Sequence, residues 1–311
     1  MSLLDKYKPD FTLILADRFE MLGAAIASVY MNIPVVHVLG GEFSGTVDEM
    51  IRHTITKLSH VHFAPTEQAK QVILQLGEDD RNVFNVGCPR IDTVREVLSQ
   101  PNNRRKRINE YLRTKGVGST FDIEDGKFIL VLQHPVTTEF GQGIFQINQT
   151  LEAVAEISEK YDLPVIMLWP NPDAGSDQVS RGIRRFREQG KDKNFHFFKH
   201  LAFEDWVWLM NRTACMVGNS SSGVRESDFI GTPIVNVGTR QQNRLRGKNV
   251  IDVGYDKEEI KKAIEKQLKH GKYPSGNLYG DGNAATRIIK ILETIEVDIQ
   301  KKFYLRNIVQ D

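Results

Sequence analysis

The amino-acid sequence predicts an α/β protein with two doubly wound domains, each built on a mainly parallel sheet. Short apolar runs without polar alternation, typical of strands buried on both faces, alternate with helical patterns along the chain. The chain has 311 residues, of which 40% are hydrophobic and 26% charged, and this length and globular composition favour two domains. We expect a first domain over residues 1–100, a connection over 101–127, a second domain over 128–282, and a C-terminal helix in 283–311 that packs back toward the first domain.

The first series of elements consists of consecutive β/α units. Its strand-like runs are Phe11–Ala16, Pro34–Leu39, Val61–Pro65 and Val83–Gly87. Helical patterns occupy Glu20–Tyr30, Asp48–Leu58 and Glu67–Leu76. Thr66 stands immediately before the third helix, where its hydroxyl can cap the first turn.

A second series follows a stretch of different character. Residues 99–127 contain Pro101 and the glycine-rich turn Gly116–Gly118, and we interpret them as a connection with one exposed helix. The basic run Arg104–Arg107 is typical of a solvated helix face, because no aromatic residues are interleaved with it. Strand-like runs then resume at Phe128–Gln133, Leu163–Trp169, Phe195–Lys199, Ala214–Gly218, Pro233–Gly238 and Asn249–Gly254.

Composition and charge disfavour several classes of partner. The formal net charge is +1, so we expect no whole-molecule attraction to nucleic acid or to a membrane. The chain lacks an apolar run of about 18 residues and the apolar core of a signal peptide, which favours a cytoplasmic protein. Cys88 and Cys215 have no metal-ligand spacing, and we expect buried free thiols.

Polar residues cluster where the strands of the first series end. Ligands of doubly wound sheets bind outside the carboxyl ends of the strands, so these positions are candidate functional sites. The candidates after the first two strands are Asp17, Arg18, Glu42, Asp48 and Glu49. Structural alternatives remain open: Asp17 and Arg18 can form a strand-end ion pair. Asp48 can also pair with Arg52, one helical turn later.

The loop Gly218–Gly223 is the clearest phosphate candidate of the second series. Its glycines allow close approach, and its hydroxyls and the following helix N-terminus can donate to anionic oxygens, although an ordinary serine-rich cap is the alternative. Arg240, after the next strand, supplies a guanidinium suited to phosphate. Arg225 and Glu226 could be surface charges, or Glu226 could accept ribose hydroxyls. His134 directly follows a buried strand and precedes a proline, which predicts an imidazole at the strand end.

Eight sequence stretches, in order over nearly the whole chain, carry a family resemblance. They are DRFE from Asp17, GGEFSGTVDEMIRHTITKLSH from Gly40, GCPRID from Gly87, LQHPVTTEF from Leu132, WPNPDAGS from Trp169, VGNSSSGVRE from Val217, GTPIVNVGTRQ from Gly231 and YGDGNA from Tyr279. Together they resemble the hydrolysing UDP-N-acetylglucosamine (UDP-GlcNAc) 2-epimerases of sialic acid biosynthesis. The set is far more specific than any single nucleotide-binding motif.

The resemblance implies a GT-B-like fold, in which a UDP-sugar binds in a cleft between two Rossmann-type domains. It implies that UDP-GlcNAc and water become N-acetylmannosamine and UDP, through loss of the C2 proton and of UDP and then hydration with inversion at C2. It implies no metal or other cofactor. The catalytic positions of the family fall on Asp17, Asp48, Glu49 and His134. Its UDP-binding positions fall on Ser220, Ser221, Glu226 and Arg240, with Arg18 near the diphosphate or the sugar. Asp17 or Asp48 would be the base, and His134 would transfer a proton or hold the leaving phosphate.

The sequence departs from the family at two places. The family begins with a strand and a Gly/Ser-Arg loop, whereas the first strand here is already the one before Asp17. We therefore expect an N-terminally truncated first domain, whose exposed sheet edge would be covered by packing on the second domain or by a homodimer or higher homo-oligomer. Leu39 stands where many members carry a glutamate, which Glu42 could replace. Both departures predict weak or absent turnover.

Three other functions remain open from the sequence. A non-hydrolysing epimerase would share the motifs but would release UDP-N-acetylmannosamine instead of the free sugar. A GT-B glycosyltransferase would also need an acceptor. A non-catalytic UDP-sugar binding protein is favoured by the two departures from the family pattern.

Overall fold

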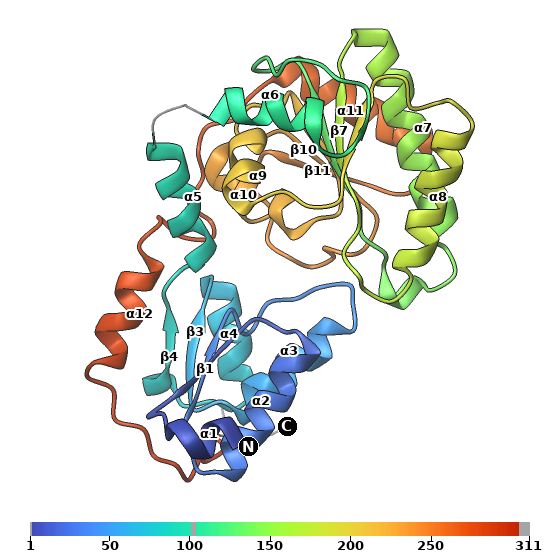
Figure 1. The fold of residues 1–311 in the computed structure, drawn as a ribbon. Coiled ribbons are helices and arrows are strands. Elements are labelled where there is room, and N and C mark those ends of the chain that lie inside the picture. The colour runs from blue at the N-terminus through green and yellow to red at the C-terminus, as the bar shows by residue number, and fades with distance from the viewer. Residues whose placement is uncertain (1, 101–103, 305–311) are drawn as a thin grey trace, which may run out of the picture. The chain divides into compact units, whose positions relative to one another are not determined.

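The chain folds into two compact units. The computed structural model describes residues 2–100 and 104–304. The first unit contains Met1–Asp92 and Tyr279–Asp311, and the second contains Thr93–Leu278. Each unit has its own sheet, flanked by helices, as Figure 1 shows. The α/β class predicted from the sequence is confirmed.

The first unit is built on a four-stranded parallel sheet with the order β1-β2-β3-β4. The strands are β1 (Thr12–Leu15), β2 (Val35–Val38), β3 (Val61–Ala64) and β4 (Val83–Asn85). Every residue of β2 and β3 is buried, which explains their unbroken apolar character. At the β1 end of the sheet, Leu13 and Leu15 are 52% and 49% exposed.

Helices follow the first three strands of the first unit as the sequence predicts, and they are α2 (Phe19–Tyr30), α3 (Asp48–Leu58) and α4 (Glu67–Gln75). The expected C-terminal helix is α12 (Ala284–Leu292). The unit also contains elements that the sequence did not predict, namely α1 (Ser2–Tyr7), the 3₁₀ turn η1 (Asp80–Asn82) and the start of α5 (Pro89–Ser99). Thr66 caps α4 by accepting a hydrogen bond from the Ala69 amide at 3.1 Å. Figure 1 shows α12 alongside β4, where Arg287 donates to the Val86 carbonyl at 3.0 Å.

The second unit has a seven-stranded sheet with the order β11-β10-β9-β6-β7-β8-β5, parallel except for β5. The strands are β5 (Val117–Gly118), β6 (Ile129–Leu132), β7 (Val165–Leu168), β8 (Phe195–Phe198), β9 (Cys215–Gly218), β10 (Ile234–Val237) and β11 (Val250–Val253). The helical elements are α6 (Arg104–Thr114), η2 (Thr137–Glu139), α7 (Gly143–Tyr161), α8 (Ser176–Glu188), α9 (Phe203–Met210), η3 (Ser221–Gly223), α10 (Glu226–Ile230) and α11 (Lys257–His270).

The segment that the sequence analysis assigned to a connection belongs to the second unit. Helix α6 buries Ile108 and Leu112, and β5 adds an antiparallel edge to β8. The basic run is not simply a solvated face, because Arg104 and Arg107 both bond the buried carboxylate of Asp205. Pro101 lies outside the described residues.

Cys88 and Cys215 are both buried free thiols. In the part of the chain that the structure describes, no helix combines the length and the apolarity that a membrane crossing requires.

Candidate functional site

In the first unit, Arg52 connects α3 to the loop after β1. The Arg52 side chain is 1% exposed, and one of its terminal nitrogens bonds the carboxylate of Asp17. The other donates to the Glu42 carbonyl at 2.5 Å. The sequence left a helix-face pair between Arg52 and Asp48 open as an alternative, but these two partners of Arg52 lie on the strand-end loops instead. Arg52 thus holds Asp17 and Glu42 at one place.

A buried histidine fixes the backbone just before Asp17. The ring of His37 in β2 lies between the Ala16 carbonyl, 2.9 Å from Nε2, and the Thr56 hydroxyl, 3.1 Å from Nδ1. Burial lowers the pKa of His37 to about 3, so the ring is neutral and its Nε2–H donates to Ala16. Ala16 and Leu39, at the ends of neighbouring strands, both have left-handed backbone, with φ of 63° and 69°.

The acidic residues at the start of α3 are tied to the loop that precedes them. The carboxylate of Glu49 accepts the Ser44 amide at 2.5 Å and lies 4.0 Å from Nε2 of His53. Asp48 accepts the Thr46 hydroxyl at 3.1 Å. Carboxylates at a helix N-terminus are favoured by the positive end of the helix dipole. The structure therefore orders both candidate carboxylates on one short segment.

Three other sequence expectations concern this unit. Arg18 has a half-exposed side chain, and its Nε lies 3.7 Å from the Glu20 carboxylate. Leu39, where many members of the resembled family carry glutamate, is 3% exposed and lies among core residues. Glu42 is 5% exposed, so this carboxyl residue is buried close to the Asp17–Arg52 pair.

In the second unit, Asn219 joins the loops after two adjacent strands. Strands β6 and β9 pair in parallel, and His134 and Asn219 follow their carboxyl ends. The His134 amide donates to the Asn219 side chain at 2.7 Å, and that side chain donates to the His134 carbonyl at 2.9 Å. A Cβ on Gly218 would lie 2.1 Å from the Leu132 carbonyl oxygen, so only glycine allows this close approach.

The hydrogen bonding of His134 defines its protonation. Its Nδ1 accepts the Asn171 backbone N–H at 3.0 Å. Burial, together with the positive charge of Arg240, lowers the pKa of His134 well below its ordinary value. The neutral ring therefore carries its proton on Nε2, where the imidazole is a hydrogen-bond donor.

The side chain of Arg240, which follows β10, contacts the serine-rich loop Gly218–Gly223. Its Nη1 donates to the Asn219 carbonyl at 3.2 Å, and Nη2 lies 3.7 Å from the Asp173 carboxylate. Gln241 also donates to the Asn219 carbonyl, at 2.8 Å. The predicted convergence of loop Gly218–Gly223 and Arg240 is therefore present in the structure.

The serine-rich loop leads into a 3₁₀ turn and then a short helix. Ser220 caps the 3₁₀ turn η3, which contains Ser221, by accepting the Ser222 amide at 3.3 Å. Helix α10 then extends for only five residues. Arg225 and Glu226 are 9% and 3% exposed, which excludes the alternative that they are surface charges.

Glu139 connects the segment that follows His134 to the segment that carries Arg240. Its carboxylate accepts hydrogen bonds from the hydroxyls of Thr239 and Tyr255, the latter at 2.8 Å, and from the Gln146 amide at 2.5 Å. Thr239 directly precedes Arg240 in sequence. Glu139 therefore holds the segment after His134 against the segment that carries the guanidinium.

The candidates are divided between the two units, and no hydrogen bond or ion pair described above joins Arg18 or Glu226 to the other candidates of its unit. The first unit holds Asp17, Arg18, Glu42, Asp48 and Glu49, and the second holds His134, Ser220, Ser221, Glu226 and Arg240. The roles of Arg52 and Asn219 were not predicted from the sequence, although both residues stand inside the stretches that carry the family resemblance. Among residues 2–100 and 104–304, no group of three or more His, Cys, Asp or Glu side chains is placed to hold a metal ion.

Comparisons with known proteins agree on one family. A family model described as UDP-N-acetylglucosamine 2-epimerase matches residues 1–293. The hydrolysing UDP-N,N'-diacetylbacillosamine 2-epimerase of Legionella pneumophila is 37% identical over 299 residues, which are 96% of this chain and 74% of that protein. The UDP-N-acetylglucosamine 2-epimerase of Neisseria meningitidis is 32% identical and aligns with 97% of this chain and 76% of its own length.

Solved structures show the same fold. The UDP-GlcNAc 2-epimerase of Methanocaldococcus jannaschii, in complex with UDP-GlcNAc and UDP, superposes with a TM-score of 0.76 at 22% identity. The match covers 94% of this chain and 78% of that chain. The GT-B-like class expected from the sequence is therefore confirmed.

Proposed function

The chain belongs to the UDP-N-acetylglucosamine 2-epimerase family, and from this premise we propose that it is a hydrolysing epimerase of a UDP-2-acetamido sugar. The substrate that we propose first is UDP-GlcNAc, which would yield N-acetylmannosamine and UDP. UDP-N,N'-diacetylbacillosamine is a second candidate, because hydrolysing relatives that carry this name are 37% and 33% identical to the chain. We also propose that the protein is cytoplasmic and that it forms a homo-oligomer.

The observation that carries the proposal is the Asn219 hub of the second unit. Asn219 bonds the backbone of His134 through its side chain and accepts from Arg240 through its carbonyl. It thereby gathers a neutral imidazole donor and a guanidinium beside the hydroxyls of Ser220 and Ser221. Preorganised donors of this kind stabilise the charge that develops on a departing diphosphate.

The proposed reaction has two stages. In the first, a carboxylate removes the C2 proton while the C1–O bond breaks, so that UDP leaves with the electron pair and a C1=C2 double bond forms. In the second, water supplies a hydroxyl to C1 and a proton is delivered to the opposite face of C2. The free sugar is then released with inverted C2.

We assign the residues to these stages by their chemistry. Asp17 or Asp48 removes the C2 proton, and Glu49 belongs to the same carboxylate group. His134, whose ring proton is on Nε2, donates to the leaving diphosphate rather than acting as the base. Arg240 binds the diphosphate, and Glu226 binds the ribose hydroxyls.

The test is incubation of the purified chain with each UDP-sugar in D₂O. We expect UDP release that is slow, because of the two departures from the family pattern, together with a free sugar with inverted C2 and one deuterium at C2. Formation of a UDP-sugar epimer would show a non-hydrolysing enzyme instead. UDP binding by calorimetry without turnover of either substrate would contradict the proposal and favour a binding protein. Comparing Asp17→Asn with Asp48→Asn in the same assay separates the two candidate bases, since removal of the base abolishes deuterium uptake.

A further inference from the structure

The last turn of α3 and the residue after it surround the ammonium group of Lys301, which comes from a segment far along the chain. The Nζ of Lys301 lies 3.2 Å from the Thr56 carbonyl, 2.8 Å from the Lys57 carbonyl and 2.5 Å from the Ser59 carbonyl. A carboxylate oxygen of Glu78 is 2.6 Å away. An ammonium group has three N–H donors, so it cannot donate a separate hydrogen bond to each of the four oxygens.

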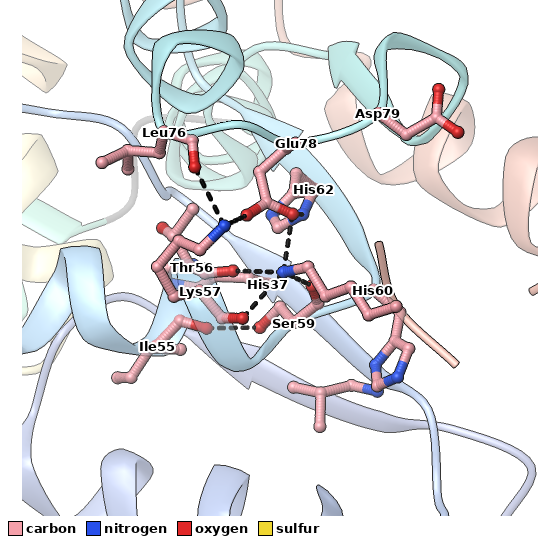
Figure 2. Close-up of polar contacts among 12 residues, drawn as sticks. His37, Ile55, Thr56, Lys57, Ser59, His60, His62, Leu76, Glu78 and Asp79 are labelled. Carbon is pink, nitrogen blue, oxygen red and sulfur yellow. Dashed lines mark hydrogen bonds and ion pairs between the residues drawn. The ribbon is translucent and has the colours of Figure 1, made fainter. Parts of the chain in front are cut away.

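Glu78 supplies the negative charge of the cluster, and Figure 2 shows it facing His62 and Lys57. Its side chain is 2% exposed, with His62 Nε2 at 3.0 Å and Lys57 Nζ at 2.6 Å. Burial alone would raise the pKa of Glu78, but the His62 hydrogen bond and the Lys301 charge outweigh it and lower the pKa to about 2. Glu78 is therefore ionised at neutral pH.

Lys301 remains a cation in this place. Burial, partly offset by Glu78, lowers the pKa of Lys301 to about 8, which leaves the amine protonated at pH 7. Burial also lowers the pKa of His62, so its ring is neutral and Nε2–H donates to Glu78. The charged groups at the cluster are thus Glu78, Lys57 and Lys301.

The segment around Lys301 docks on the first unit through further contacts. The Tyr304 amide donates to the Gly77 carbonyl at 3.0 Å, and its hydroxyl accepts from Arg81 at 3.2 Å. The Ile299 carbonyl lies 3.3 Å from His60 Nε2. We call residues 299–304 the C-terminal strap.

The oxygen set has the chemistry of a site for a large monovalent cation. Carbonyl and carboxylate oxygens are hard-cation ligands, and distances of 2.5–3.2 Å to Lys301 Nζ exceed the 2.0–2.1 Å that magnesium requires. Glu78 supplies a single negative charge, and Lys57 already balances part of it, so the oxygen set does not suit a divalent cation. A cation beyond the last turn of α3 is also favoured by the helix dipole.

We propose that the carbonyls of Thr56, Lys57 and Ser59 and the carboxylate of Glu78 form a monovalent-cation site, which the C-terminal strap occupies with the ammonium of Lys301. The strap then docks by placing its own cation, the Lys301 ammonium, in this site. A free ammonium or potassium ion takes the same oxygens when the lysine is removed. The occupied site fixes the last turn of α3, whose first turn carries Asp48 and Glu49.

The test is the salt dependence of thermal unfolding for Lys301→Ala. In tetramethylammonium chloride, whose cation is too large for the site, we expect the Tm of the variant to lie about 5–10 °C below that of the native chain. Ammonium or potassium chloride at equal ionic strength should restore at least half of this loss in a saturable way. Lys302→Ala, which removes an exposed charge from the same strap, serves as the matched control and should show no such selectivity.

Adding Glu78→Gln to Lys301→Ala should abolish the response to ammonium and potassium. If Lys301→Ala folds only in ammonium or potassium salts, the proposal is supported. An equal Tm in all three salts contradicts it, as does failure of both Lys301→Ala and Lys301→Met to fold in any of them. The readout is stability, so the result is independent of whether the chain turns over a UDP-sugar.

Discussion

At the scale of single residues, the second unit depends on an asparagine rather than on its catalytic candidates alone. Asn219 bonds His134 in both directions and accepts from Arg240 and Gln241. It is fully buried, so no water can replace these bonds without rearrangement. A residue with this many partners sets the distance between the imidazole and the guanidinium.

Asn219→Ala should lower kcat/KM for UDP release by about 10–100-fold, because two side-chain hydrogen bonds to the His134 backbone are lost. The binding of UDP alone should weaken less than turnover falls. Steady-state kinetics and calorimetry measure the two quantities. Asn148→Ala, on α7, is the control and should change neither.

A second residue-scale prediction concerns His37 and pH. The pKa of His37 is about 3 in the folded chain and 6.5 ordinarily. Below pH 6.5, His37 therefore binds a proton in the unfolded chain but remains unprotonated in the folded chain. Stability therefore falls as pH falls from 6.5 toward 3. Between pH 7.5 and 5.5, His37 should account for about 1 kcal/mol of the free energy of unfolding.

Urea denaturation of the native chain and of His37→Gln at the two pH values measures this contribution. The variant should lose less stability on acidification than the native chain. His200→Gln, which replaces an exposed histidine, should lose as much stability on acidification as the native chain. Equal slopes for the native chain and His37→Gln would contradict the assignment of a neutral, buried ring.

At the scale of elements, α3 organises the first unit. Its first turn carries two candidate carboxylates, Arg52 in its middle reaches the loop after β1, and its last turn surrounds Lys301. The helix is amphipathic, and Ile55 packs into the core beneath it. One element therefore connects the candidate chemistry to the C-terminal strap.

Arg52→Met should destabilise the first unit by roughly 3–5 kcal/mol, because it leaves the Asp17 carboxylate without its buried ionic partner while keeping the apolar stem. Thermal unfolding followed by circular dichroism measures the loss. Arg181→Met removes an exposed helix-face pair with Asp177 and should cost less than about 1 kcal/mol. A similar Tm for both variants would show that the Asp17 pair contributes no special stability.

At the scale of the whole molecule, the first unit exposes apolar surface at one end of its sheet. Leu13 and Leu15 project from the same face of β1, and Phe19, in the helix that follows, is 68% exposed. An edge strand with such side chains favours association between molecules. This surface is the structural basis for expecting an oligomer.

The double variant Leu13→Lys Leu15→Lys should lower the mass of the chain in solution, because charges on an edge strand oppose pairing. Size-exclusion chromatography with light scattering measures the mass. Val117→Lys, on the edge strand β5 of the second unit, is the matched control and should leave the mass unchanged. An unchanged mass for the double variant would exclude this surface as the association site.

Much of the architecture was predictable because it depends on local patterns. The strands of both sheets coincide with the apolar runs within one or two residues, and Thr66 caps its helix as predicted. The edge strand β5 was missed, since two residues have no periodicity to detect. The buried carboxylate that holds Arg104 and Arg107 lies about 100 positions away in sequence, so the basic run looked solvated.

The sequence by itself determined the fold class, the order of the strands and helices, and the candidate residues at strand ends, because hydrophobic periodicity and contiguous motifs are local properties of a chain. Only the tertiary structure decided which partner each charged or polar group takes. Arg52 bonds Asp17 rather than Asp48, Asn219 joins His134 to Arg240, and Lys301 fills an oxygen cluster more than 220 positions away in sequence. Such pairings depend on which loops the parallel sheet brings to one edge and on which groups must be satisfied once they are buried.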